Sequence, residues 1–458
     1  MKRKKTNTFL LAVLLLFVLA GPAARCDDKK DEIKNLVVFT LDTTRADRLS
    51  CYGYEKETTP AIDKVARQGV LFENCASCSS ITPVSHASIF TGMYPYHHGL
   101  RSMHGTEDLV MNHDTVTLAQ ALEKEGYNTA AFVSAFPVSR RYGLDRGFRM
   151  FDEEFQCKHP QKAVGKGGMV DTGTCQRRAD ATTKSALKWL FEHHRQNFFV
   201  WVHYFDPHDP ILLPPEEFRP ETGPEEAGRK EYLRDLYDGE IRFMDRELGK
   251  VVDWLRDQGL YENTLIVIVA DHGEGLGDHD FWTHGILYQE QVLLPLIFRV
   301  PGMEGKRVSG RVRSIDIMPT ILDLLGVRDP QQTDGKSLVP AMKSGRDIKD
   351  RPAYAESQNK FSMRVMGRVY QKDVMYSLTR GDYKYILNIT GAQEELYNLS
   401  RDPGEQKNLA GDERYSSRKA ALQKELEKRM KISPVPPPLD TASPEVIKKL
   451  KSLGYTAQ

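Results

Sequence analysis

The stretch Thr-Leu-Ile-Val-Ile-Val-Ala-Asp-His-Gly-Glu, residues 264–274, decides the fold. Its first part, 264–270, is apolar and rich in β-branched residues, which is typical of a strand buried on both faces of a parallel sheet. The polar residues Asp271 and His272 follow at once. Ligands bind beyond the carboxyl ends of strands in open parallel sheets. This stretch therefore predicts a central strand with a functional site at its end.

Four other segments have the same character and alternate with helical patterns. The apolar runs 35–41, 128–134, 198–204 and 293–300 predict further buried parallel strands. Apolar residues recur at helical spacing in residues 59–68, 115–125, 179–194, 230–257 and 316–325. This alternation predicts an α/β domain over residues 33–345, with a large, doubly wound, mostly parallel sheet flanked by helices.

The pattern changes after Pro352. Short aromatic and β-branched segments at 375–378 and 383–388, followed by Glu-Leu-Tyr-Asn-Leu from Glu395, predict a small antiparallel sheet. Residues 416–430 have the composition of a solvated helix. We therefore expect a C-terminal α+β subdomain at 346–432, followed by a Pro-rich linker and a short terminal helix at 433–458.

The first residues, 1–25, have the pattern of a secretory signal peptide. Lys2–Lys5 are basic and precede an apolar run at 9–20, and small residues follow at 21–24. The apolar run is shorter than the roughly 20 residues of a membrane span. We expect a secreted or periplasmic protein without stable membrane insertion after cleavage, with an uncleaved anchor as the alternative.

Cysteine content and net charge bear on disulfide formation and on the class of binding partner. The chain has 6 Cys, and Cys157 and Cys175 flank a Gly-rich insertion that a disulfide could staple, although spacing leaves the pairing open. Lys plus Arg number 64 against 63 Asp plus Glu, a net charge of +1, which gives no sign of a nucleic-acid partner. The oligomeric state has no signature in the sequence.

Acidic residues follow three of the predicted strands. Asp42 follows the strand at 35–41, Asp206 the one at 198–204, and Asp271 the one at 264–270. A single aspartate in such a place is usually a helix cap or a turn residue. Three of them, two beside histidines, favour convergence on one crevice, where Asp42, Asp271 and His272 would supply three ligands to a divalent cation.

A second informative segment, residues 80–92, reads Ser-Ile-Thr-Pro-Val-Ser-His-Ala-Ser-Ile-Phe-Thr-Gly. Thr82 precedes a helix that we expect to begin near Ser85. The Thr82 hydroxyl is therefore a candidate nucleophile or ligand, and the helix N-terminus would favour an anionic ester. Without the carboxylates at 42 and 271, a helix-capping threonine would be the better interpretation.

Five motifs in order along the chain resemble the sulfatase branch of the alkaline phosphatase superfamily. They are Leu-Asp-Thr-Thr-Arg from Leu41, the segment around Thr82, His-Tyr-Phe-Asp-Pro-His-Asp-Pro from His203, Asp-His-Gly-Glu from Asp271, and Glu-Leu-Tyr-Asn-Leu from Glu395. The resemblance implies metal ligands at Asp42, Asp271 and His272, the nucleophile at Thr82, and a leaving-group or substrate histidine at His208. It also implies one bound divalent metal ion, Ca²⁺ in most of the family.

The resemblance extends to further candidate residues. His284 falls near the position of a substrate lysine in many sulfatases, so we expect it to contact sulfate or phosphate. His86 stands where the family has arginine and joins Thr82, His208 and His284 in the predicted catalytic set. The remaining candidates for substrate binding are Arg45, Arg101 and His203, with two alternatives left open: a pairing of Arg45 with Asp47, and a purely structural role for His203.

The chain departs from the sulfatase pattern at the nucleophile. The family segment is Cys-x-Pro-Ser-Arg-Ala-Ser-x-x-Thr-Gly, and its Cys or Ser is oxidised to formylglycine, which a threonine at position 82 cannot become. Thr43 also stands where many sulfatases have a second Asp ligand. Loss of that carboxylate weakens a Ca²⁺ site, and the imidazole of His272 also suits Zn²⁺ or Mn²⁺, so all three metals are alternatives.

These features lead to one functional prediction and two alternatives. We predict an exported, metal-dependent hydrolase that cleaves sulfate or phosphate esters of a small molecule or glycan through Thr82 or a metal-activated water. The first alternative is a Thr-nucleophile phosphoesterase or phosphodiesterase. The second is a catalytically inactive protein that binds sulfated glycans.

Overall fold

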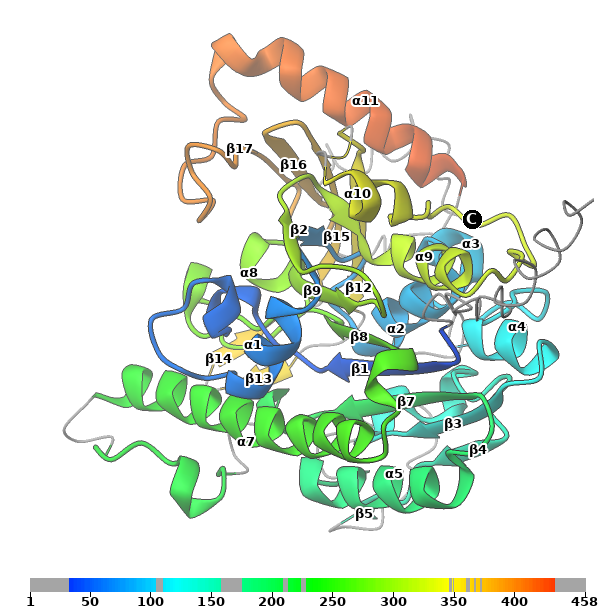
Figure 1. Ribbon diagram of the computed structural model, residues 1–458. Helices are drawn as coiled ribbons and strands as arrows, with labels where there is room; N and C mark the ends of the chain where they lie inside the picture. Colours follow the sequence, from blue (N-terminus) through cyan, green and yellow to red (C-terminus); the bar gives the residue numbers. More distant parts are fainter. Residues whose placement is uncertain are drawn as a thin grey trace, which may run out of the picture.

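The computed structural model describes residues 33–103, 110–157, 175–208, 213–223, 228–345, 348, 350–359, 363–365, 368–370 and 373–432 (Figure 1). The predicted signal peptide, the Pro-rich linker and the terminal helix lie outside these ranges. Within them, no helix combines the length and apolar character needed to cross a membrane.

A large mixed sheet forms the centre of the molecule. Its strand order is β10-β2-β9-β8-β1-β7-β3-β4, with β11 beside β2. The strands are β1 Asn35–Leu41, β2 Val70–Ala76, β3 Asn128–Phe132, β4 Met150–Asp152, β7 Phe198–Tyr204, β8 Thr264–Ala270, β9 Leu293–Arg299, β10 Lys306–Val308 and β11 Val312–Arg313. The central strands β1, β7 and β8 are parallel and wholly buried, as their continuous apolar runs predict.

One predicted strand direction is wrong. The run at 293–300 forms β9, but β9 is antiparallel to both of its neighbours, β2 and β8. Its apolar composition reflects burial on both faces, and burial does not depend on strand direction.

Helices cover both faces of the large sheet. Helices α5 and α7 lie on one face, and α2, α4 and α9 lie on the other (Figure 1). The helices of this domain are α1 Pro60–Arg67, α2 Thr82–Thr91, α3 Pro95–His98, α4 Leu118–Lys124, α5 Ala179–His193, α7 Arg229–Asp257, α8 Gln289–Val292, α9 Ile317–Leu324 and α10 Val339–Ser344. The predicted doubly wound α/β architecture is thus confirmed.

Short 3₁₀ helices connect several of these elements. They are Ala46–Arg48, Ser50–Tyr52, Phe136–Val138, Arg140–Tyr142, Asp206–His208, Glu216–Phe218, Tyr261–Asn263, Asp278–Asp280, Ser314–Asp316 and Glu413–Tyr415.

A separate four-stranded antiparallel sheet follows, in the order β12-β15-β16-β17. Its strands are β12 Ala353–Asn359, β15 Asp373–Arg380, β16 Tyr383–Asn388 and β17 Gln393–Asn398. Helix α11, Ser416–Ile432, packs on β15 and β16. On this sheet Ala355, Met375, Ile386 and Tyr397 pack against Ile286, Leu287 and Val292 of the first domain. The C-terminal sheet therefore supports the segment between β8 and β9.

The described residues also contain two small pairs of strands. β13 Met363–Val365 pairs with β14 Arg368–Tyr370, and β5 Gln156–Cys157 pairs with β6 Cys175–Gln176. The backbones of Cys157 and Cys175 lie directly opposite each other in the second pair. The disulfide between them stays a prediction.

Candidate active site

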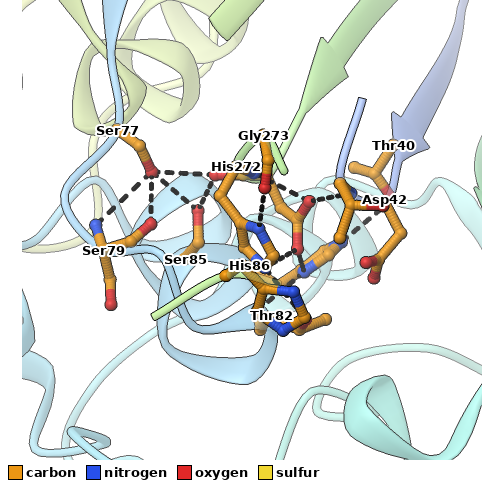
Figure 2. A network of polar contacts seen from close by, with 12 residues as sticks. Thr40, Asp42, Ser77, Ser79, Thr82, Ser85, His86, His272 and Gly273 are labelled. Atoms are coloured by element: carbon orange, nitrogen blue, oxygen red, sulfur yellow. Dashed lines mark hydrogen bonds and ion pairs between the residues drawn. The ribbon is translucent and has the colours of Figure 1, made fainter. Parts of the chain in front are cut away.

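Three neighbouring strands place the candidate ligands at one edge of the sheet. Leu41 at the end of β1 pairs with Ala270 at the end of β8 and with Tyr204 at the end of β7. The next residues, Asp42, Asp271 and His272, are fully buried, and one ligand atom from each lies within 4.8 Å of the others (Figure 2). The expected convergence of these three residues is thus found.

Asp206, the third expected carboxylate, does not join them. Its Oδ1 accepts a hydrogen bond from the Ala179 backbone N–H at 3.2 Å and lies 3.6 Å from Arg178, at the start of α5. It therefore caps a helix, which corrects the prediction that all three strand-end carboxylates meet. Burial raises its pKa to about 6 despite the Arg178 charge.

Asp42 offers one free carboxylate oxygen. Its Oδ2 lies 3.1 Å from Nε2 of His203, whose Nδ1 accepts from the Ser134 backbone N–H at 3.2 Å. Because Nδ1 is the acceptor, Nε2 carries the hydrogen and donates it to Asp42. Burial lowers the pKa of His203 to about 3, so the ring is neutral near pH 7. Among the described residues, Asp42 Oδ1 has no hydrogen-bond partner.

Asp271 is arranged in the same way. Its Oδ1 accepts from the backbone N–H groups of Thr43 at 3.1 Å and His272 at 2.8 Å. Its Oδ2 has no hydrogen-bond partner among the residues that the structure describes. Burial raises the pKa of Asp42 well above its usual range, and the nearby charges of Asp271 and Glu274 raise it further. Two buried carboxylates with free oxygens fit a divalent cation between them.

His272 completes this set and contacts the candidate nucleophile. Its Nδ1 lies 3.0 Å from the carbonyl oxygen of Gly273, which can only accept, so Nδ1 carries the hydrogen. Nε2 is therefore left as an acceptor, and it lies 3.1 Å from Oγ1 of Thr82 (Figure 2). Burial lowers the pKa of His272. The free oxygens of Asp42 and Asp271, together with Nε2, are three ligand atoms of the kinds that bind a divalent metal.

Thr82 is the first residue of α2, and Pro83 in the first turn favours helix initiation there. His86 lies one helical turn after Thr82 in α2. Its Nδ1 donates to the Thr82 carbonyl at 2.8 Å and its Nε2 accepts from Thr40 Oγ1 at 3.1 Å. Burial lowers the pKa of His86 to about 4, against the opposing effect of Asp271. The structure thus gives His86 contacts that hold the helix start.

Ser77 and Ser85, which the sequence analysis did not predict as site residues, link α2 to the end of β8 through hydrogen bonds. Ser85 Oγ donates to the Asp271 carbonyl oxygen at 2.6 Å, and Ser77 Oγ lies 2.8 Å from the same oxygen (Figure 2). The two hydroxyls are 3.2 Å apart. The abundance of serine at 77–88 was the signal available, but serine clusters are common in loops. These bonds fix the position of Thr82 relative to Asp271.

His284 and His208 extend the histidine cluster away from His272. The ring centroids of His272 and His284 are 4.6 Å apart, and those of His284 and His208 are 4.9 Å apart. Glu274, which sequence reasoning did not single out, lies 3.2 Å from His284 Nδ1 through its Oε2. Burial, and then the neighbouring His284 and His272, lower the pKa of His208. The cluster therefore extends from the ring of His272, which contacts Thr82, to His284 and then His208.

The two arginines expected to bind substrate are held by carboxylates. Arg45 pairs with Asp47 and Asp278, each at 2.6 Å, so the structural alternative for Arg45 is the arrangement found. Arg101 makes two bonds of 2.7 Å to Glu356. The Arg101–Glu356 pair is buried on both sides, whereas the buried Arg45 guanidinium is paired with two exposed carboxylates. The substrate-binding role predicted for these arginines gains no support from the geometry.

Comparison with known proteins identifies the family to which the chain belongs. The family model described as Sulfatase matches residues 34–327, and the one described as N-sulphoglucosamine sulphohydrolase, C-terminal, matches residues 277–432. A Delta 4,5-hexuronate-2-O-sulfatase from Bacteroides thetaiotaomicron is 26% identical, over 87% of this chain and 88% of that protein. The multifunctional alkaline phosphatase superfamily protein PehA from Trinickia caryophylli is 25% identical, over 84% and 92%.

Solved structures have the same fold. The phosphonate monoester hydrolase of Agrobacterium radiobacter superposes with a TM-score of 0.67 at 21% identity, covering 87% of this chain and 96% of the other. The solved structure of a 2-O GAG sulfatase gives a TM-score of 0.68 at 21% identity, covering 87% and 92%. At this identity the similarity shows the fold alone.

Proposed function

Because the chain belongs to the sulfatase family, we propose that it is a metal-dependent ester hydrolase in which Thr82 is the nucleophile. One observation carries this proposal. Thr82 Oγ1 lies 3.1 Å from His272 Nε2, beside two buried carboxylates that each have a free oxygen among the described residues. A threonine that only caps a helix would not be expected to face two carboxylates and an imidazole.

The donor set fits a divalent cation held by Asp42, Asp271 and His272. A bound cation would neutralise charge on the ester and favour ionisation of a nearby hydroxyl. The resemblance to the family predicts Ca²⁺ as the bound metal. The imidazole of His272 is also a suitable ligand for Zn²⁺ or Mn²⁺. The fit rests on the free carboxylate oxygens.

The chain's own residues supply the rest of the reaction. Thr82 Oγ forms a bond to phosphorus or sulfur while the bond to the leaving alcohol oxygen breaks. The start of α2 directs backbone N–H groups toward the anionic group. His284 and His208, next in the cluster, would contact its oxygens and relay the proton released by the Thr82 hydroxyl to the leaving alcohol.

The second half of the reaction separates the two ester classes. Water can attack phosphorus in a phosphothreonine, which breaks the Thr82 Oγ–P bond and restores the hydroxyl. A sulfothreonine lacks the elimination route that formylglycine provides. We therefore expect phosphate esters or diesters to turn over faster than sulfate esters. The phosphonate monoester hydrolase with this fold supports phosphoryl chemistry as a reaction that the fold can accommodate.

Two further parts of the proposal rest on other observations. Residues 1–25 carry the signal-peptide pattern, so we propose export to the periplasm or the medium. The name of the relative at 26% identity, a hexuronate-2-O-sulfatase, supports a glycan or a small molecule as the alcohol part.

The test is steady-state turnover of aryl phosphate, aryl phosphodiester and aryl sulfate by the purified, metal-analysed protein. Thr82→Ser, which keeps a hydroxyl, is the control for Thr82→Ala. We expect Thr82→Ser to retain turnover and Thr82→Ala to lose it with its metal content unchanged. Turnover that survives in Thr82→Ala would identify a metal-activated water as the nucleophile. Metal binding without turnover on any substrate would favour the sulfated-glycan binding protein.

A further inference from the structure

His284 lies in a loop whose backbone conformation needs outside support. The loop follows the end of β8 and leads to α8, and it contains Leu276, His279 and Asp280 with φ between 48° and 57°. Residues with side chains rarely adopt this left-handed conformation, which costs of order 1 kcal/mol or more for each residue. Such a loop holds one shape only when contacts from other segments fix it.

The side chain of Gln291 makes such contacts on both sides of His284. Its Oε1 accepts from the backbone N–H of Gly285 at 2.9 Å and of Ile286 at 3.0 Å. Its Nε2 donates to the carbonyl oxygen of Thr283 at 3.1 Å. Gln291 is completely buried, so water does not compete for these bonds.

The main chain of Gln291 reaches the other histidine of the pair. Its carbonyl oxygen accepts from the N–H of Gly273 at 2.9 Å. Gly273 follows His272 directly and accepts the hydrogen bond from His272 Nδ1. One residue therefore fixes the backbone next to both imidazoles, whose centroids are 4.6 Å apart.

The C-terminal sheet adds one more bond at the same place. Ser357 of β12 is buried, and its Oγ donates to the carbonyl oxygen of Gly285 at 2.6 Å. Gly285 has φ of 120°, a conformation that suits glycine, and its N–H and C=O are thus both held by side chains.

We propose that Gln291, assisted by Ser357, is a positioning residue that holds the His284 imidazole opposite His272 for contact with the ester group. The inference rests on the proposed function, because it needs His284 to act on the substrate. Rotation of the backbone at 283–285 would swing the ring away from His272. A displacement of about 1 Å in a catalytic group can lower a rate about 100-fold.

The test compares two glutamine variants. Gln291→Met keeps the side-chain length and removes the three side-chain bonds. Gln331→Met is the matched control, because the Gln331 amide also bonds backbone groups on two segments, at Thr91 and Val116. We expect Gln291→Met to lower kcat on aryl phosphate by about 10- to 100-fold. Gln331→Met should keep it within about twofold, as expected of a substitution away from the reacting groups.

A double-mutant cycle with His284→Ala decides whether Gln291 acts through His284. If it does, Gln291→Met has no further effect on kcat in the His284→Ala background. An equal fold-loss in both backgrounds, or an equal loss in Gln331→Met, would overturn the proposal. Should Gln291→Met fail to fold, Ser357→Ala enters the same cycle with a smaller expected loss.

A second readout is independent of turnover. Carbethoxylation of His284 by diethyl pyrocarbonate, followed by peptide mass spectrometry, reports how firmly the ring is held. We expect it to be several-fold faster in Gln291→Met than in the wild type and in Gln331→Met. Equal rates in the three proteins would refute the positioning role. A wild type that turns over none of the esters but shows the rate difference would refute the proposed function alone.

Discussion

Asp42→Asn should stabilise the protein in a chelator and abolish its stabilisation by a divalent cation. The ligand oxygens of Asp42 and Asp271 lie within 4.8 Å of each other, and neither has a hydrogen-bond partner among the described residues, although Asp271 Oδ2 lies 3.3 Å from His272 Nε2. At a pH that ionises both carboxylates despite the raised pKa of Asp42, two unit charges at that distance repel by about 3 kcal/mol at an effective dielectric constant of about 20. The substitution removes this repulsion but introduces an amide whose lost hydrogen bonding costs about 1 kcal/mol. The expected net gain is about 2 kcal/mol.

With the cation bound, the wild type should be more stable than Asp42→Asn. A ligand at about 100 times its dissociation constant stabilises the folded state by about 2.7 kcal/mol, and the Asp42→Asn variant loses one of the charged ligands. Urea unfolding of both proteins in EDTA and in Ca²⁺, Mn²⁺ or Zn²⁺ measures the two differences. Asp206→Asn is the control, because Asp206 lies at the start of α5 and outside the ligand set, so this substitution should change stability by the same amount with and without the cation. An Asp42→Asn variant less stable than wild type in EDTA, or equally stabilised by the cation, would refute the reasoning.

Two further predictions concern stability around the site. The hydrogen bond and charge of Glu290 outweigh burial and raise the pKa of His279 from 6.5 to about 9. This pair should therefore contribute its full stability, on the order of 2 kcal/mol, below pH 6.5, and lose it as pH rises through 9. The urea midpoint of His279→Gln should lie below that of the wild type at pH 6, and the difference should shrink at pH 10, where only the loss of stacking on Tyr288 and of the contact with Glu405 remains; a difference of the same size at both pH values would contradict the pairing. Ser85→Ala should cost about 1 kcal/mol by removing the bond to the Asp271 carbonyl, with a smaller cation-induced shift in the urea midpoint; an unchanged shift would show that Ser85 does not fix the ligand strand.

The central strands could be predicted from sequence because burial leaves a direct mark on composition. β1, β7 and β8 are buried on both faces, and their runs contain almost only apolar residues. Strand direction leaves no such mark, which is why β9 was expected to be parallel. β2 was missed because Glu73 and Asn74 interrupt its apolar run, at the point where its register with β9 shifts.

The candidate site was predictable where ionisable residues follow strands directly. Asp42, Asp271 and His272 needed no tertiary information, because adjacent parallel strands bring their ends together. Arg45 lies only a few residues further on, and its carboxylate partner Asp278 comes from a distant loop that sequence spacing does not place. Gln291 carries no charge and no motif, so its bonds around His284 could be found only in the folded chain.

The charges around Thr82 show why a cation matters to the proposed reaction. Arg45 and Arg101 are already paired with carboxylates. Burial holds the pKa of His86, of His203 and of His272 below the ordinary value, so these rings bring no positive charge near pH 7. An anionic ester would then approach two carboxylates with free oxygens and meet repulsion.

Family members with arginine at the position of His86 have a positive charge that this chain lacks. The N-terminus of α2 supplies about half a unit charge, too little to offset two carboxylates. Under the proposed function, attraction for the ester and ionisation of the Thr82 hydroxyl therefore both depend on the cation at Asp42, Asp271 and His272. Loss of the cation should consequently weaken substrate binding as well as turnover, whereas loss of the Thr82 hydroxyl should affect turnover alone.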